Sequence, residues 1–173
     1  ALRSRGFRSN VFSLIRRVLH AAYGEAWHKV PYSEEQTWGE VLLTPSLIYT
    51  PLINALIQAA VPLAGIAHIT GGGIADNFSR VLKANQVGAE LDQLFAPLPV
   101  MERLMDLGQV SPQDAYLYWN MGNGMLLVAD QEQVETILAQ AQKLDYAAQV
   151  AGTITDVPRI RLTTPLAVLE EAY

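Results

Sequence analysis

The sequence predicts an α+β fold, in which helices pack on a layered mixed sheet. Segments with helical spacing of apolar residues alternate along the chain with short apolar or alternating runs, and interleaved helices and strands favour such layers. The chain has 173 residues, of which 50% are hydrophobic and 17% charged, so it can bury a sizeable core. No repeat, low-complexity tract or internal linker interrupts it. We therefore expect residues 1–173 to form a single domain.

The first expected helix covers residues 11–22. Apolar residues recur there at helical spacing, and Ser9 or Asn10 supplies a side-chain oxygen for the N-cap. Residues 24–40 are polar and contain several turn-forming residues, which predicts a loop.

The next segments lead from this loop into the middle of the chain. Residues 41–50 begin as an extended run that Pro45 interrupts. Pro51 then opens a helix over 51–60, because a missing N–H costs no hydrogen bond in the first turn. The apolar run 63–70 predicts a buried strand that leads directly into three glycines.

The second half of the sequence continues the alternation. A short helix is expected over 74–82, a strand over 87–92, and an amphipathic helix over 98–109 that Gly108 closes. Ser111 and Pro112 mark the start of the following helix as cap and first-turn residue. The remaining expected elements are the end of that helix at 119, a strand over 124–130, a helix over 131–145, and strands within 146–155 and 159–163.

Charge and composition exclude several classes of function. The formal net charge of −5 argues against a domain that coats nucleic acid. No apolar run is long enough to cross a bilayer, no signal-peptide pattern is present, and the absence of cysteine excludes disulfides and thiolate chemistry. The histidines His20, His28 and His68 lack the spacing typical of metal ligands, so no metal site is predicted. We expect a cytoplasmic protein.

The segment HITGGGIADNFSRVL, residues 68–82, contains the first candidate site. Gly71, Gly72 and Gly73 follow a strand and precede a helix, so their N–H groups and the helix N-terminus could bind a phosphate. The segment matches neither the P-loop nor the dinucleotide-binding pattern. A tight turn with close strand–helix packing is an equally good interpretation, and both stay open on the residues alone.

Two further segments could contribute to a site. Gly122 precedes and Gly124 begins the strand 124–130, where glycine permits a close approach of the backbone to a ligand or simply makes a turn. His68 lies in an apolar strand, where a histidine is more often structural than catalytic. The stretch FRSN, residues 7–10, places a hydroxyl, an amide and Arg8 at a helix start, where ordinary capping is the simpler explanation.

Together and in order, these segments resemble a known family. The motifs HITGGGIADNFSRVL, WNMGNGMLLVAD and GFRSNVFSLIRRVL, with LLTPSLIY between them, are similar to the C-terminal domain of the phosphoribosylformylglycinamidine cyclo-ligases, also called aminoimidazole ribonucleotide synthetases. The likeness extends from about Arg3 to about Arg161. It implies a domain of α/β/α layers and an ATP-dependent ring closure in purine biosynthesis.

The resemblance also implies where ligands bind. ATP and Mg²⁺ are expected to bind mainly in an N-terminal domain, which is also the usual core of a homodimer, and neither is expected within this domain. Since the sequence begins with Ala1, we expect a piece of a longer enzyme that is inactive alone. The residues implied to bind the phosphorylated ribonucleotide are Ser9, Asn10, His68, Thr70, Gly71, Gly72, Gly73, Asn120, Gly122 and Gly124.

The sequence departs from the family at one motif. Where the family has His-Ser-Asn-Gly, this chain has Arg8, Ser9, Asn10 and Val11, and arginine can replace the charge of histidine but not its proton transfer. The catalytic residues are not identified. An alternative prediction is therefore a non-catalytic domain of the same superfamily that binds a phosphorylated metabolite or a partner protein.

Overall fold

The computed structural model describes residues 1–8 and 11–172 and confirms the predicted α+β class. The helices are α1 (Phe12–Tyr23), α2 (Trp38–Leu42), α3 (Thr50–Gln58), α4 (Gly73–Leu82), α5 (Pro99–Gly108), α6 (Pro112–Tyr118) and α7 (Val134–Lys143). The strands are β1 (Leu2–Arg3), β2 (Gly65–His68), β3 (Gly88–Leu91), β4 (Asn123–Val128), β5 (Gly152–Thr155), β6 (Arg159–Thr163) and β7 (Val168–Ala172). Short 3₁₀ turns occupy Trp27–Lys29, Lys83–Asn85 and Gln131–Gln133.

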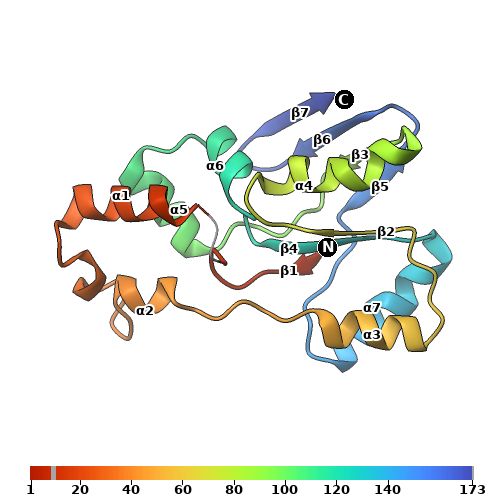
Figure 1. Cartoon of the computed structure of the whole chain (residues 1–173), viewed down its shortest axis with the longest axis horizontal. Helices are drawn as coiled ribbons and strands as arrows, with labels where there is room; N and C mark the ends of the chain where they lie inside the picture. The colour runs from red at the N-terminus through yellow and green to blue at the C-terminus, as the bar shows by residue number, and fades with distance from the viewer. Residues whose placement is uncertain (9–10, 173) are drawn as a thin grey trace.

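The strands form two sheets (Figure 1). The first has the order β1-β4-β2 and is antiparallel, with Ala67 of β2 opposite Leu126 of β4. The second has the order β5-β3-β6-β7, in which β3 and β6 run parallel while the outer pairs are antiparallel. The second sheet is therefore mixed, as predicted, whereas the first is purely antiparallel.

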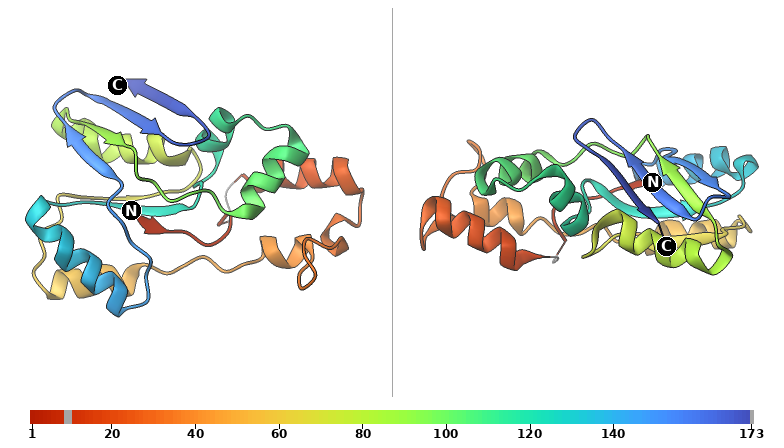
Figure 2. Two further views of the ribbon diagram at one scale, coloured as in Figure 1. Left: turned by 180° about the vertical axis from the view of Figure 1, so that it is seen from behind. Right: turned by 90° about the horizontal axis from the view of Figure 1, so that it is seen from above.

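Helices cover the three-stranded sheet on both sides (Figure 2). Helix α4 packs against β2 and α6 and reaches β6, so Ile74 and Phe78 join a core shared with the second sheet. Helices α3 and α7 pack together on the other side, where Leu52, Leu56 and Ile137 form a second apolar cluster with β1 and β4. Helices α1 and α5 pack against each other at the far end of the molecule.

The predicted loop over 24–40 and the extended start at 41 are wrong in part. Trp38–Leu42 form helix α2, which a capping box stabilises: the Thr37 hydroxyl accepts from the Glu40 N–H, and the Glu40 carboxylate accepts from the Thr37 N–H. Trp38 is fully buried, which anchors this short helix. Tertiary burial thus outweighs the polar, turn-rich composition of the segment.

The strand predictions need smaller corrections. Within 146–155 only Gly152–Thr155 form a strand. Two strands were not predicted: β1 has only two residues, and β7 is a partly exposed strand at the edge of its sheet. The predicted helices and the strand that precedes the glycines are confirmed within a few residues. That strand is not buried as predicted, because in β2 only Ala67 is buried while Ile66 and His68 are exposed. Among the described residues, no helix is long and apolar enough to cross a membrane.

The start of α1 differs from the prediction of a side-chain cap. Val11 is the N-cap residue, with φ 53° in the left-handed region and no side-chain cap hydrogen bond. A β-branched residue is strained there, and the cost is on the order of 1–3 kcal/mol. Ser9 and Asn10, which were predicted to cap this helix and to bind substrate, lie outside the described residues.

Candidate functional site

The three glycines form the tight connection between β2 and α4. Gly72, the N-cap of α4, has φ 95°, and Gly73 has φ 68°, so both adopt the left-handed backbone that favours glycine. A Cβ on Gly73 would overlap the carbonyl oxygen of Tyr116 in α6. The glycines therefore permit close packing of two helix ends, as the tight-turn interpretation requires.

Asn77 holds this turn from within α4. Its side-chain N–H groups donate to the carbonyl oxygens of Thr70, Gly71 and Gly73 at 3.4, 3.2 and 2.7 Å. Its Oδ1 accepts from the Thr70 hydroxyl at 3.1 Å. The Thr70 hydroxyl is therefore engaged as a donor, and only its lone pairs can serve a ligand.

The charges around the turn are of both signs. Within the described part of the chain, no group accepts a hydrogen bond from the N–H of Gly71 or Gly72, so these donors are available to an anion. Asp76 lies in the first turn of α4, where a Cβ on Gly72 would overlap its carboxylate, and it pairs with Arg80 at 2.6 Å. Within that exposed ion pair, Arg80 partly neutralises the carboxylate beside the glycine turn. Phosphate binding by the turn remains a prediction.

The second glycine segment lies beside the first because β4 pairs with β2. The Ile69 N–H donates to the Gly124 carbonyl at 3.1 Å, one residue beyond the last paired residue of β2. Asn120 is buried, donates to the Gly6 carbonyl, and accepts from the Gly122 N–H. Its amide thus fixes the backbone before β4 through one N–H group and the carbonyl oxygen.

Arg8 joins the two segments. Its Nη1 donates to the carbonyls of Ile69 and Gly124 at 2.9 and 2.7 Å. The guanidinium also lies over the Tyr49 ring, 5.6 Å from its centroid, and a Cβ on Gly124 would overlap the Tyr49 hydroxyl. Glycine at position 124 therefore lets Tyr49 approach this junction. The sequence placed Arg8 at a helix start and marked it as a departure from a motif, but did not indicate these contacts and did not single out Asn77 or Tyr49.

His68 is exposed on β2, next to this junction. Burial of part of the ring lowers its pKa from the ordinary value of 6.5, and the positive charge of Arg8 lowers it further. The imidazole is therefore neutral at pH 7 and can both donate and accept a hydrogen bond. Its role in supporting or contacting the glycine turn stays a prediction.

This shift gives the protein a defined pH response. The folded state binds a proton at His68 less readily than the unfolded chain does. Protonation of this histidine therefore lowers the free energy of unfolding as the pH drops through 6.5. We expect the His68 ring signals in an NMR titration to report a pKa below 6.5 and to shift towards that value in Arg8→Gln. A His68 pKa at or above 6.5 in the unaltered chain would contradict this account.

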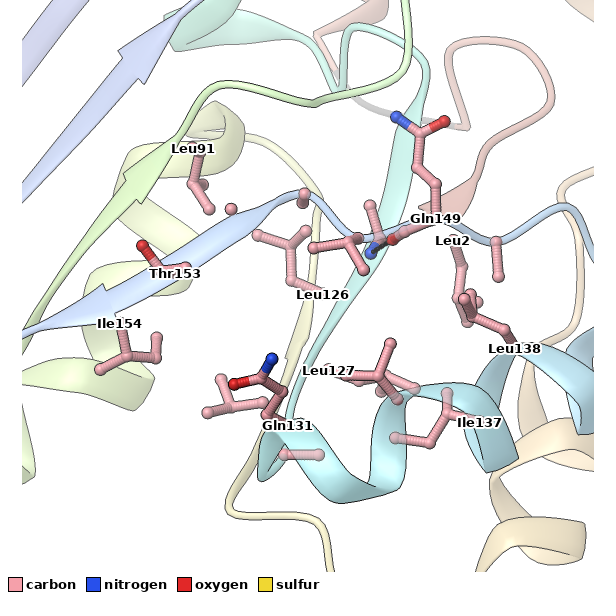
Figure 3. Close-up of a pocket in the computed structure, with 18 of the residues that line it drawn as sticks. Leu2, Leu91, Leu126, Leu127, Gln131, Ile137, Leu138, Gln149, Thr153 and Ile154 are labelled. Atoms are coloured by element: carbon pink, nitrogen blue, oxygen red, sulfur yellow. Dashed lines mark hydrogen bonds between the residues drawn. The ribbon is translucent and has the colours of Figure 1, made fainter.

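A separate apolar groove of about 640 Å³ lies between β4, α7 and β5 (Figure 3). Leu126, Leu127, Ile137 and Leu138 line it, and none of the predicted site residues does. No lysine or arginine side chain lines it, and because it contains none of the predicted residues it is not the predicted site. In residues 1–8 and 11–172 no three His, Asp or Glu side chains gather as a metal site.

The structure therefore brings most of the predicted residues to one edge. His68, Thr70 and the glycines 71–73 leave β2 there, and Gly122 and Gly124 enter β4 beside them. Backbone N–H groups, a neutral imidazole and a guanidinium converge on this edge, a combination suited to binding an oxyanion rather than to activating a nucleophile.

The chain matches known proteins over most of its length. It is 37% identical over 161 residues to a phosphoribosylformylglycinamidine cyclo-ligase from Gloeobacter violaceus. That alignment covers 92% of this chain and 47% of the relative. It is 38% identical over 138 residues to the same enzyme from Gloeothece citriformis, covering 79% of this chain and 40% of the relative. The chain thus spans about half the length of the curated relatives it matches.

Solved structures support the fold. PurL from Thermotoga maritima in complex with ATP aligns with a TM-score of 0.52 and 14% identity over 70% of this chain and 20% of its own. Phosphoribosylformylglycinamidine synthase II from the same organism aligns with a TM-score of 0.51 and 13% identity over 70% of this chain and 19% of its own. The family model of the "AIR synthase related protein, C-terminal domain" matches residues 1–165. The chain belongs to this family of AIR synthase related C-terminal domains.

Proposed function

We propose that this chain forms the substrate-binding part of an ATP-dependent cyclo-ligase of purine biosynthesis, which converts formylglycinamidine ribonucleotide to aminoimidazole ribonucleotide. The observation that carries the proposal is the pairing of β2 with β4, which places the two glycine segments that resemble the cyclo-ligases at one edge. The curated relatives, at 37 and 38% identity, bear that enzyme's name.

In this reaction ATP phosphorylates the formyl oxygen of the substrate. A nitrogen of the substrate then attacks the formyl carbon, the bond to the phosphorylated oxygen breaks, and inorganic phosphate leaves as the ring closes. The share of this chain is to hold the ribonucleotide. The N–H groups of Gly71 and Gly72 would donate to its phosphate, whereas that of Gly73 donates to the Thr70 carbonyl within the turn. The backbone at Gly122 and Gly124 would shape the neighbouring wall.

ATP and Mg²⁺ have no evident ligands in this chain. The carboxylates of the described residues do not gather as a metal site, and no P-loop pattern is present. We propose that both bind outside the described residues, in an N-terminal domain that also forms a homodimer.

A second candidate is a non-catalytic domain that binds a phosphorylated metabolite or a partner protein. The observation in its favour is Arg8, which stands at the family's histidine and uses Nη1 on two backbone carbonyls. A guanidinium stays protonated and cannot transfer a proton at neutral pH, so a reaction that needs an acid or base at this position would fail.

A chimeric enzyme tests the proposal. This chain is fused to the N-terminal half of the Gloeobacter violaceus cyclo-ligase, and formation of aminoimidazole ribonucleotide and ADP is measured. We expect ATP-dependent turnover by the chimera and none by either half alone. A folded chimera that binds the ribonucleotide by calorimetry without forming product would favour the second candidate.

A matched pair of variants tests the glycine cradle in the same chimera. Gly72→Asp places a carboxylate where the substrate phosphate is proposed to lie, whereas Gly24→Asp changes another glycine of positive φ in open space. We expect only Gly72→Asp to weaken ribonucleotide binding, by about tenfold or more. Equal binding by the two variants would exclude the cradle.

A further inference from the structure

The guanidinium of Arg8 has more hydrogen-bond donors than the described residues accept from. Both N–H groups of Nη1 are directed at the carbonyls of Ile69 and Gly124, which fixes the plane of the group. Among residues 1–8 and 11–172, no group accepts a hydrogen bond from Nη2 or Nε, and no carboxylate lies within ion-pair distance. Three oriented N–H donors are therefore left for a ligand.

The surroundings of Arg8 favour an anion as that ligand. The guanidinium is partly buried over the Tyr49 ring, and burial lowers its pKa without removing the charge at neutral pH. A desolvated cation without a carboxylate partner is costly, and an incoming oxyanion would offset that cost. The backbone of Arg8 has φ 58°, a strained conformation for a side-chain-bearing residue that is typical of functional positions.

The position of Arg8 identifies the kind of anion. The Ile69 carbonyl that it binds lies two residues before Gly71, and the Gly124 carbonyl belongs to the second glycine segment. The unused N–H groups of Gly71 and Gly72 and the imidazole of His68 lie on the same edge. Guanidinium and backbone N–H groups together match the several oxygens of a phosphate monoester, with guanidinium nitrogens binding two of them side by side.

We propose that Arg8 binds the phosphate of a phosphate monoester through Nη2 and Nε, while Nη1 holds the two glycine segments together. The inference deepens the proposed function, since it rests on that function only for the identity of the natural ligand. It makes residue 8 a binding residue of this chain, where the chain departs from its family's histidine. Arginine thereby contributes charge and geometry in place of proton transfer.

Calorimetry with ribose 5-phosphate tests this proposal on the unaltered 173-residue chain. We expect saturable binding, a weakening of about tenfold or more in Arg8→Gln, and a change of less than about twofold in Arg17→Gln, which removes an exposed arginine of α1. Because the bound anion lies near His68, binding is also expected to raise the His68 pKa in an NMR titration. A purely structural clamp would not produce that rise.

Several results of these binding experiments would contradict the role of Arg8. No binding at millimolar ligand, or a folded Arg8→Gln that binds as tightly as the unaltered chain, would overturn the proposal. If Arg8→Gln does not fold, Arg8→Lys retains a charge without the planar fork, and unchanged binding by this variant would overturn it equally. Turnover by the chimera with intact binding in the Arg8 variants would refute the role of Arg8 alone. Binding that depends on Arg8 in a chimera without turnover would refute the proposed function alone.

Discussion

Gly73→Ala is expected to lower the free energy of unfolding by about 2–4 kcal/mol, the sum of backbone strain at positive φ and steric overlap. At φ 68° the alanine Cβ is disfavoured by its own backbone, and it would also overlap the Tyr116 carbonyl oxygen of α6. That oxygen belongs to a helix backbone, which cannot rotate away as a side chain can. Relief requires α4 and α6 to separate, which would open the core around Ile74.

Gly24→Ala is the matched control. Gly24 has φ 75°, similar to Gly73, but nothing lies within 4 Å of a Cβ built there. The control therefore measures backbone strain without steric overlap, on the order of 1–3 kcal/mol, because φ 75° with ψ −165° is a conformation that alanine rarely adopts. Urea unfolding followed by tryptophan fluorescence compares the two variants. Equal losses in both would mean that the approach to Tyr116 does not stabilise the fold.

The glycine turn shows which features of the structure the sequence predicts and which it does not. Three glycines between an apolar run and a helical pattern predict a tight strand-to-helix connection, and the structure has one at that place. The sequence does not distinguish the three, because the requirement at Gly73 comes from Tyr116, a residue of a different helix. Such long-range backbone contacts leave no local pattern.

Arg8 illustrates the same limit for the candidate site. Comparison with the family motif marks the residue as unusual, but its partners are carbonyl oxygens of Ile69 and Gly124, and every residue type offers a carbonyl. Only the pairing of β2 with β4 brings these oxygens together. The motifs that form the candidate site could be recognised in the sequence, whereas the group that joins its two halves could not.

Helix α2 begins at a sequence pattern that predicts a helix start, but the surrounding residues predict a loop. Thr37 and Glu40 have the spacing of a capping box, which predicts a helix start. Gly39 and the polar residues before it argue for a loop instead. The buried ring of Trp38 decides the outcome, because it packs between Tyr23 and Tyr32 and anchors the short helix in the core.

Asn77→Asp is expected to be the most damaging single change of polar chemistry at the site. The amide nitrogen of Asn77 donates to three carbonyl oxygens of the glycine turn, and the side chain is only 7% exposed. Aspartate at neutral pH would place a charged acceptor against those three acceptors, with no donor left between them. We expect the free energy of unfolding to fall by about 3 kcal/mol or more, the cost of a buried unpaired charge with lost hydrogen bonds.

The same substitution has a pH signature that separates it from simple loss of packing. Repulsion from the carbonyls and burial would raise the pKa of the new carboxyl in the folded state above its unfolded value, so the folded protein would bind the proton more tightly. The deficit should be smallest below about pH 3, where the carboxyl is protonated in both states, and grow as the pH rises through the folded pKa. Asn85→Asp makes the identical change at an exposed residue after α4 and should cost less than about 0.5 kcal/mol. Urea unfolding of both variants at pH 4.5 and pH 7 gives the comparison. A deficit in Asn77→Asp that does not change with pH would contradict the buried charge as its cause.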